Sequence, residues 1–500
     1  MKQIALGTPL LFLFAALPAQ GQVHYHDSGA PWKHTTKRGP DAVVGGWYYN
    51  LGITGMRAVL LKDRPTHLRV KYVFEGTPAH GKVKVDDIIT GANGKRFVVP
   101  HRNGYGVEVF GGHGPMSDFG AALDESQGDR LKGRLALDVE RNGKPVRVTM
   151  DVGTKYGSYG KTFPIGCRKS DLILTELYAY IAKAQGDDGS WGPPQQNTFA
   201  PLALLASGNK AYLPAVKKCV QMHARTTKAR DKSWLINWRY MAAAIVMSEW
   251  YLATGEKWVL PELQEVYDFL TTTQYTDMSQ IAESAKKRNP PKDNKRAHGG
   301  WGHNPGYEGY GPIAMLTGQG ALALSMMHRC GIKIDRSLHE KAYNFVLRGT
   351  GRNGYVWYAD VPSRHDRWAD MGRTGAAALA NALSPYEDAR FKKQAIKHAR
   401  VIGEHPETLP DTHGSPIMGM GYTALGAFVD PASFRKMMDS NRWWFTLAHC
   451  ADGTFYFQPN RDYNASDFTS GGSRISASAV VALIFSAKKK DLYLTGAHRK

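Results

Sequence analysis

The chain has 500 residues, of which 42% are hydrophobic and 22% are charged, so we expect two or more domains with a proper apolar core. Its formal net charge is +20 at pH 7, and a basic protein attracts anions. Acidic polysaccharide, teichoic acid or anionic lipid headgroups fit this charge better than nucleic acid, because the opening residues predict export. The cysteines are widely spaced without a CxxC pair, which argues against a metal knuckle. The sequence leaves two alternatives for Cys167, Cys219, Cys330 and Cys450, which are disulfide bonds or buried free thiols.

The first 21 residues predict a cleaved signal peptide. Lys2 gives the positive start, Leu10 to Leu17 form the apolar core, and Ala19-Gln20-Gly21 supplies small residues for cleavage. The apolar run is shorter than the roughly 20 residues that span a bilayer. We therefore expect a secreted or periplasmic protein with no integral membrane segment after cleavage. The alternative is a buried N-terminal helix.

Residues 40–155 predict a small β-rich domain. Val83 to Ile89 alternates and then becomes apolar, and Asn93-Gly94 is a strong turn signal. Leu135 to Met150 predicts a hairpin, because two alternating segments flank Asn142-Gly143.

These segments, with Gly76-Thr77-Pro78-Ala79, resemble the signature of bacterial PDZ domains, although Asp86 stands where that family usually has glycine. The resemblance implies that this domain binds a protein C-terminus or an extended peptide by adding a strand to a sheet edge. The segment that resembles the carboxylate-binding loop supplies the candidate peptide-binding residues Leu51, Gly52, Ile53, Gly55 and Met56. The alternative is that its glycines only make a turn.

After a Gly-rich linker over 156–169, residues 170–496 predict helices in about six outer–inner pairs. The inner members are rich in Ala and Gly. Variants of one turn recur beside them, as Gly189-Ser190-Trp191, Gly299-Gly300-Trp301 and Gly453-Thr454-Phe455. With Gln185, the first of these turns resembles the "Q-x-x-x-G-x-W" turn of the α/α-toroid superfamily, which includes the terpenoid cyclases and prenyltransferases. The expected architecture is thus a PDZ-like domain followed by an α/α toroid, with an open helical solenoid as the alternative. The whole arrangement also resembles an exported bacterial family of unknown function.

Three polar clusters precede predicted inner helices, so we expect them on one rim of the ring, around one cavity. They are His298 to Pro312, Arg364 to Thr374 and Asp411 to Ser415. The candidate catalytic residues are His303, Tyr307, Glu308, Tyr310, Asp370, Arg373 and His413, and the candidate ligand-binding residues are His298, Trp301 and Asn304. Trp191 and Trp301 have packing between repeats as an alternative role. No cofactor or metal is predicted.

Several activities of toroid proteins lack their motif in this chain. There is no DxDD acid motif of squalene cyclases, no GCGEQ thioester loop and no GxSxG elbow. His449-Cys450 with Asp452 lacks the spacing of a prenyltransferase zinc site. One reading is an exported scaffold whose PDZ-like domain binds a peptide and whose toroid binds a glycan or protein. The alternative is a carbohydrate-active enzyme on an acidic polysaccharide. It would be a lyase using Tyr and His with Asn or Arg, or a hydrolase using Glu308 and Asp370.

Overall fold

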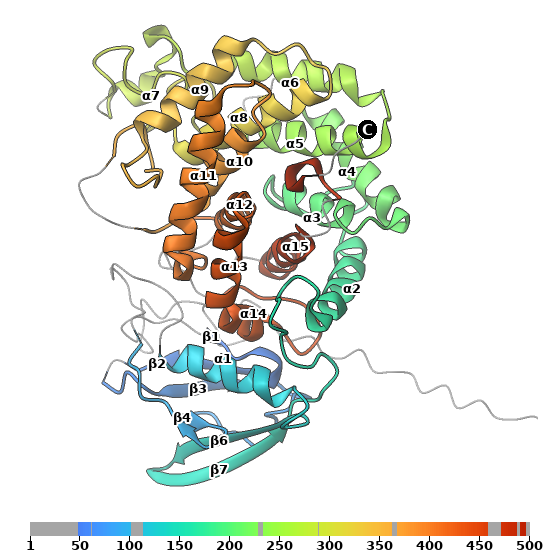
Figure 1. Cartoon of the computed structure of the whole chain (residues 1–500), viewed down its shortest axis with the longest axis vertical. Coiled ribbons are helices and arrows are strands. Elements are labelled where there is room, and N and C mark those ends of the chain that lie inside the picture. Colours follow the sequence, from blue (N-terminus) through green and yellow to red (C-terminus); the bar gives the residue numbers. More distant parts are fainter. Residues whose placement is uncertain are drawn as a thin grey trace, which may run out of the picture.

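The computed structural model describes residues 49–61, 63–101, 114–228, 234–288, 290–362, 368–458, 472–487 and 491–496. The predicted signal peptide, the first residues of the predicted β-rich domain and part of the Arg364 to Thr374 cluster lie outside the described residues. A small sheet with one helix lies at one end of the molecule, and the helical domain forms the rest (Figure 1). Among the described residues, no helix combines the length and the apolar character that a membrane crossing requires.

The sheet is antiparallel throughout. Its order is β1-β2-β3-β4-β6-β7, with β5 paired to β4. The strands are β1 (Tyr49–Asn50), β2 (Met56–Leu60), β3 (Leu68–Val73), β4 (Ile88–Ala92), β5 (Lys95–Arg96), β6 (Arg134–Arg141) and β7 (Lys144–Asp151). Leu135, Leu137 and Val139 of β6 are buried and alternate with more exposed residues, as expected of a sheet with one covered face. The predicted hairpin is present, and its turn residues Asn142 and Gly143 both have positive φ.

The predicted peptide-binding loop is buried where the sheet packs against the helical domain. Leu51, Gly52, Ile53, Gly55 and Met56 are all buried. The short 3-10 helix in this loop, Gly52–Thr54, contacts α14 (Arg442–Ala448) of the helical domain. Strand β2 pairs with β3 along its length and, on its other edge, with the two residues of β1 at Arg57 and Ala58. The prediction of a peptide site at these five residues is therefore corrected, because the chain itself covers them.

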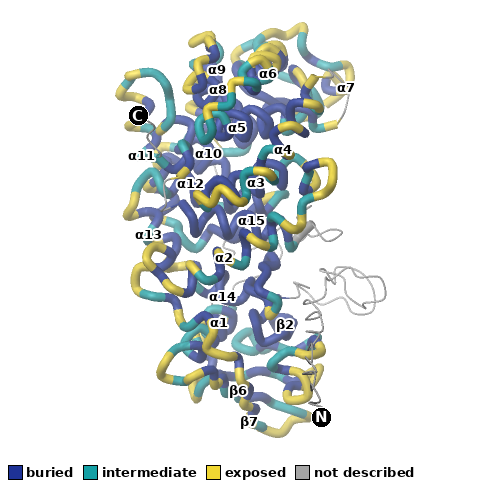
Figure 2. The backbone as a smooth tube through the Cα atoms, turned by 90° about the vertical axis from the view of Figure 1, so that its right-hand side faces the viewer, coloured by how far each residue is buried: buried dark blue, intermediate teal, exposed yellow. Residues whose placement is uncertain are grey.

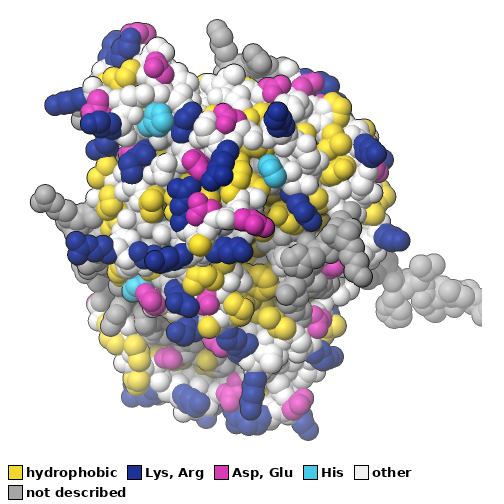
Figure 3. Space-filling view, turned by 45° about the horizontal axis from the view of Figure 1, so that its top comes forward, with side chains coloured by type: hydrophobic (Ala, Val, Ile, Leu, Met, Phe, Trp, Pro, Cys, Tyr) yellow, Lys and Arg dark blue, Asp and Glu magenta, His cyan; other side chains and the backbone are white. Residues whose placement is uncertain are grey.

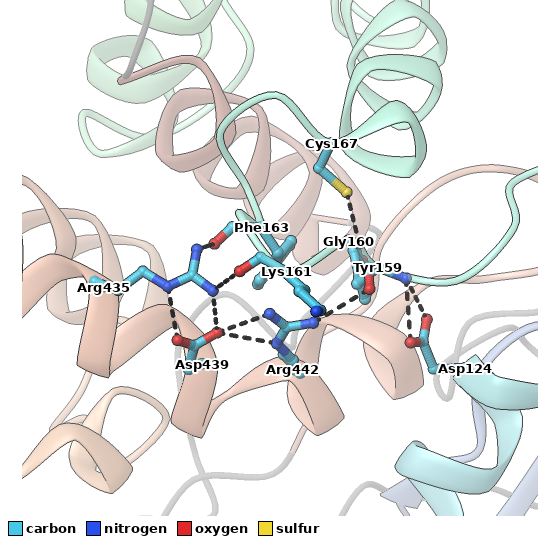
Figure 4. Close-up of polar contacts among 9 residues, drawn as sticks. All are labelled: Asp124, Tyr159, Gly160, Lys161, Phe163, Cys167, Arg435, Asp439 and Arg442. Carbon is cyan, nitrogen blue, oxygen red and sulfur yellow. Dashed lines mark hydrogen bonds and ion pairs between the residues drawn. The ribbon is translucent and has the colours of Figure 1, made fainter.

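A polar network fixes the linker between the two parts (Figure 4). Arg435, in α13 (Pro431–Ser440), donates to the carbonyl of Phe163 over 2.9 Å and to that of Lys161. Asp439 bridges Arg435 and Arg442, and Arg442 donates to a linker carbonyl at Tyr159. On the other side, Asp124 of α1 (Pro115–Ser126) accepts the backbone N–H of Tyr159 over 3.1 Å. The linker is thus held from both parts.

The helical domain is a closed ring of helix pairs. The inner helices are α3 (Gln196–Leu205), α5 (Ile236–Thr254), α8 (Ala314–Arg329), α10 (Gly372–Ala382), α12 (Pro416–Ala427) and α15 (Gly472–Ser486). The outer helices are α2 (Arg168–Lys183), α4 (Leu213–Thr226), α6 (Val259–Thr273), α9 (Arg336–Arg348), α11 (Ala389–Glu404) and α13. Each inner helix contacts the next, and α15 contacts α3, which closes the ring. Within the described residues this closure excludes the open solenoid and gives the toroid-like arrangement.

The inner helices are buried around their whole circumference, as the dark blue tube in the middle of Figure 2 shows. Every residue from Ala314 to Met327 of α8 is buried. Small residues make this packing possible, because a Cβ on Gly375 of α10 would lie 1.9 Å from the carbonyl oxygen of Tyr422 in α12. The glycine- and alanine-rich segments of the sequence therefore mark the helices at the centre.

Recurring turns of one construction precede four of the inner helices, namely α3, α8, α10 and α15. Two residues after the glycine, a backbone N–H donates to a polar side chain on that inner helix. The four pairs are Trp191–Asn197 at 2.7 Å, Trp301–Thr317 at 3.0 Å, Val356–Thr374 at 3.0 Å and Phe455–Ser478 at 3.1 Å. The indole N–H groups of Trp191 and Trp301 donate to the carbonyls of Ile181 and Leu270 on preceding outer helices. Both tryptophans therefore pack the repeats together. The four cysteines are buried free thiols.

Candidate functional site

Five of the six inner helices begin around one cavity of about 460 Å³. Most of its lining residues stand in the turn before an inner helix or in the first turn of that helix. They are Pro193, Pro194, Gln195, Leu235, Trp238, His303, Tyr310, Ile313, Met315, Tyr358, Asp370, Arg373, His413, Gly414, Ser415 and Met418. The three polar clusters of the sequence therefore meet at one end of the ring.

A chain of hydrogen bonds runs along the cavity wall through His303. The indole N–H of Trp238 donates to Nδ1 of His303 over 2.8 Å. The other ring nitrogen, Nε2, is in hydrogen-bond contact with the hydroxyl of Tyr310. The hydroxyl of Tyr358 donates to the same oxygen of Tyr310 over 3.1 Å. One phenol oxygen thus collects two polar partners at the cavity.

The tautomer of His303 follows from these contacts. An indole N–H only donates, so Nδ1 of His303 is an acceptor and the proton of the neutral ring is on Nε2. Burial lowers the pKa of His303, although the charge of Glu308 opposes this shift. The ring is therefore neutral near pH 7, and its Nε2–H donates to the oxygen of Tyr310. Burial and the hydrogen bond to Tyr310 both raise the pKa of Tyr358, which keeps that phenol protonated as a donor.

Arg373 lies buried beneath the aromatic wall. Its guanidinium donates to a carboxylate oxygen of Asp370 over 2.8 Å and to the hydroxyl of Tyr355 over 2.9 Å. It also donates to the carbonyl of Val356 and lies 5.6 Å from the ring centre of Tyr358. Burial alone would lower the pKa of Arg373, but the charge of Asp370 and the bonded tyrosine raise it overall. Arg373 is therefore a permanently charged residue that is held in place by these hydrogen bonds and stabilises the base of the cavity.

The electrostatics at this end of the ring favour an anion. An α-helix has partial positive charge at its N-terminus, and the N-terminal ends of α3, α5, α8, α10 and α12 surround the cavity. The wider surface is basic but mixed, as the chain has 64 Lys and Arg against 44 Asp and Glu. Figure 3 shows Lys and Arg side chains across one face with acidic side chains among them. The preference of the cavity for an anion thus comes from the helix N-termini together with the positive net charge.

The structure brings together only part of the predicted site. His303, Tyr310, Asp370, Arg373 and His413 line the cavity, and His413 packs edge-on against Tyr358 with ring centres 5.6 Å apart.

The other predicted residues have different surroundings and do not line this cavity. Tyr307 is buried against Tyr275 in a separate apolar cluster, and Trp301 is a packing residue. Asn304 accepts the backbone N–H of Ile236 at the start of α5 and donates to Glu308 over 3.1 Å. The carbonyl of His298 accepts a hydrogen bond from Arg348 of α9. Their assignment to the site is therefore corrected, because these contacts support the loop that carries His303.

Sequence reasoning missed Trp238 and Tyr358, which complete the hydrogen-bond chain. Trp238 lies in the first turn of α5. An aromatic residue in an apolar helix is usually interpreted as part of the hydrophobic core. Tyr358 follows the Gly354 turn, a member of the recurring set that lacks tryptophan two residues after its glycine. Recognising that turn as equivalent to the others would have placed Tyr358 near the rim. Among the described residues, no group of three His, Cys, Asp or Glu side chains is arranged to hold a metal ion.

A family model described as a domain of unknown function (DUF6288) matches residues 170–496, which is the helical ring. The chain belongs to this family. No curated protein matches it in sequence. Among solved structures, the DUF6288 ring is similar to the GH76A α-1,6-mannanase of Salegentibacter sp. HEL1_6, with 13% identity and a TM-score of 0.44 over 64% of this chain and 98% of that one. A polysaccharide lyase gives 11% identity and a TM-score of 0.43 over 66% of this chain and 98% of the lyase.

Cellobiose 2-epimerase from Bacillus thermoamylovorans B4167 gives 12% identity and a TM-score of 0.39 over 64% of this chain and 98% of the epimerase. These likenesses are low, so the chemistry of the DUF6288 cavity has to be inferred from its own residues.

Proposed function

We propose that the cavity binds an acidic glycan and cleaves it by β-elimination, with the oxygen of Tyr310 as the base. The observation that supports this most directly is the pair of donors on that oxygen. Nε2–H of His303 and the hydroxyl of Tyr358 both point at it. Donors fixed at one oxygen stabilise negative charge that develops there.

The reaction needs only groups that the cavity supplies. In the proposed step, the phenolate form of Tyr310 takes the proton from the sugar carbon next to the carboxylate. The electron pair forms a carbon–carbon double bond, and the bond to the glycosidic oxygen on the next carbon breaks. The proton returns from Tyr310 to that oxygen, so the products are a new sugar end and an unsaturated uronate. The positive helix ends around the cavity would hold the substrate carboxylate.

The polar groups fit elimination better than hydrolysis. A hydrolase of the usual kind needs two carboxyl groups flanking the bond, roughly 5 to 9 Å apart. Asp370 is the one carboxylate among the described lining residues, and Arg373 pairs with it over 2.8 Å. Glu308 bonds to Asn304 and does not line the cavity. The aromatic wall formed by Trp238, Tyr310 and Tyr358 offers faces on which sugar rings stack.

The test is to incubate the purified protein with alginate, pectate and hyaluronan and to follow unsaturated ends by ultraviolet absorbance. We expect at least one substrate to be cleaved, and Tyr310→Phe to abolish the absorbance change without altering the melting temperature. Tyr251→Phe, near the C-terminal end of α5, is the matched control and should retain activity. New reducing ends without unsaturation would replace the lyase with a hydrolase. Binding without any new ends would leave only a scaffold.

A further inference from the structure

Exposed aromatic side chains gather at one point of the described surface. The two large aromatic residues exposed there are Trp234, with 67% of its surface accessible, and Tyr310, with 54%. Both contact the ring of His303, at centre-to-centre distances of 6.4 Å for Trp234 and 5.5 Å for Tyr310. The described part of the chain thus leaves large aromatic surface in water only where the cavity opens.

Aromatic side chains extend from the cavity wall to the surface outside the cavity. Trp238, which lines the cavity, meets the edge of His303 through its indole N–H, and the two ring planes are inclined by 29°. The ring of Trp234 is inclined by 28° to that of His303 at a centre-to-centre distance of 6.4 Å, and Trp234 is not a lining residue. Trp234 therefore continues, outside the cavity, the aromatic surface that Trp238 and His303 form at the cavity wall. An exposed aromatic face suits the C–H face of a sugar ring, because such a contact buries apolar surface on both partners.

The backbone beside Trp234 is held in an unusual conformation. Leu235 has a φ of +64°, in the left-handed region that few non-glycine residues adopt. Leu235 itself lines the cavity while Trp234 is exposed outside it. The next residues are fixed to the His303 loop, because the backbone N–H of Asn237 donates to the carbonyl of His303 over 3.2 Å. Strain of this kind persists where the surroundings enforce it, and it accompanies functional positions.

We infer that Trp234 is a second sugar-binding position, outside the cavity, for the neighbouring unit of an oligosaccharide. This inference rests on the proposed function for the identity of the ligand. One unit occupies the cavity next to Tyr310, and the next unit stacks on the indole of Trp234. The protein then prefers chains over monosaccharides, and the preference depends on Trp234.

The test measures binding of a length series, from one to four units, of acidic and of neutral oligosaccharides by calorimetry. We expect Trp234→Ala to weaken binding of the longer acidic oligomers by roughly tenfold, which corresponds to about 1.4 kcal/mol, and to leave the monosaccharide unchanged. Trp234→Phe should restore most of the affinity, because it keeps a flat ring. Leu347→Ala, at an exposed apolar side chain of α9, is the matched control and should have no effect.

The outcomes separate this inference from the proposed function. If the wild type produces unsaturated ends and Trp234→Ala binds every length as the wild type does, the second position is wrong and the reaction stands. If only neutral oligomers bind and their affinity depends on Trp234, the position stands and the reaction falls. Binding of neither series overturns both. Binding of vesicles with anionic lipid that depends on Trp234 would replace the sugar with a membrane surface.

Discussion

The indole N–H of Trp238 lies 2.8 Å from Nδ1 of His303 and fixes which nitrogen of that ring carries the proton. This single contact makes His303 a donor toward Tyr310. Without it, either nitrogen would be free to hold the proton. Trp238 is thus a positioning residue that acts on Tyr310 through His303.

Replacing Trp238 with phenylalanine should disturb the site without unfolding the protein. A donor to Nδ1 favours the neutral ring, so its loss should raise the pKa of His303 toward its usual value. We expect the acidic limb of the pH–rate profile to shift upward and kcat to fall about tenfold, the effect of roughly 1.4 kcal/mol. Nuclear magnetic resonance titration of His303 gives the pKa directly. Trp258→Phe removes an indole bond to Glu256 away from the cavity and is the matched control. An unchanged titration of His303 would contradict the assigned role.

Arg373 should contribute to the stability of the fold as well as to the site. It is buried, and its loss would leave the carboxylate of Asp370 without its cation. We therefore expect Arg373→Ala to reduce the free energy of unfolding by about 3–5 kcal/mol. This differs from the expectation for a residue that only binds ligand, whose removal would leave the melting temperature unchanged.

A double-mutant cycle tests the pairing. The combination of Asp370→Asn with Arg373→Met should cost less than the two single changes added together, because no charge is then left buried alone. Additive losses in urea denaturation would show that the two residues contribute separately.

The ring was predictable because its signals are local. Small residues at helical spacing mark the inner helices, and the glycine turns mark where four of them begin. The contact between the sheet and the helical domain was not predictable, because the residues that form it are far apart in the sequence. The backbone of Asn50 exchanges two hydrogen bonds with the side chain of Gln458, 408 positions away, and this pairing lies beside β2, where a peptide was expected. No local pattern in Leu51 to Met56 indicates which segment covers it.

The site was predictable to the level of turns but not of side chains. Placing three clusters before inner helices was enough to bring His303, Asp370 and His413 to one cavity. The direction of each side chain depends on which loop it packs against, so Tyr307 and Tyr310, three residues apart, point to different places. Alternation and spacing do not resolve that choice in an irregular loop.

The Gly299 turn gives a prediction for stability. Gly299 has a φ of +86°, and a Cβ there would lie 2.3 Å from the carbonyl oxygen of Lys341 in α9. Gly331 has a similar φ of +94° but open space around it. An alanine at positive φ costs about 1–2 kcal/mol by itself, so we expect Gly331→Ala to show that loss alone. Gly299→Ala should cost about 2 kcal/mol more, because the backbone of α9 has to move. Equal losses in urea denaturation would show that the turn does not require close contact with α9.

Acid should destabilise the ring through its buried histidines. Burial lowers the pKa of His223, His339 and His398 to about 4, from an ordinary value of 6.5. Each ring bonds to a neighbouring helix or turn in its neutral form, as Nδ1 of His398 does to the carbonyl of Gly354 over 2.6 Å. The unfolded chain therefore takes up protons before the folded one as the pH falls.

The direction of the pH effect follows from these shifts. The stability contributed by the neutral histidines is complete above about pH 6.5 and is lost progressively as the pH falls toward about 4. Each histidine contributes a slope of about 1.4 kcal/mol per pH unit within that range. Urea denaturation across this range measures the slope, and His398→Asn should flatten it although it lowers stability at neutral pH. Replacing the exposed His80 with asparagine is the matched control and should leave the slope unchanged. A free energy of unfolding that stays constant between neutral pH and about pH 5 would contradict the assignment, because all three neutral histidines act in that interval.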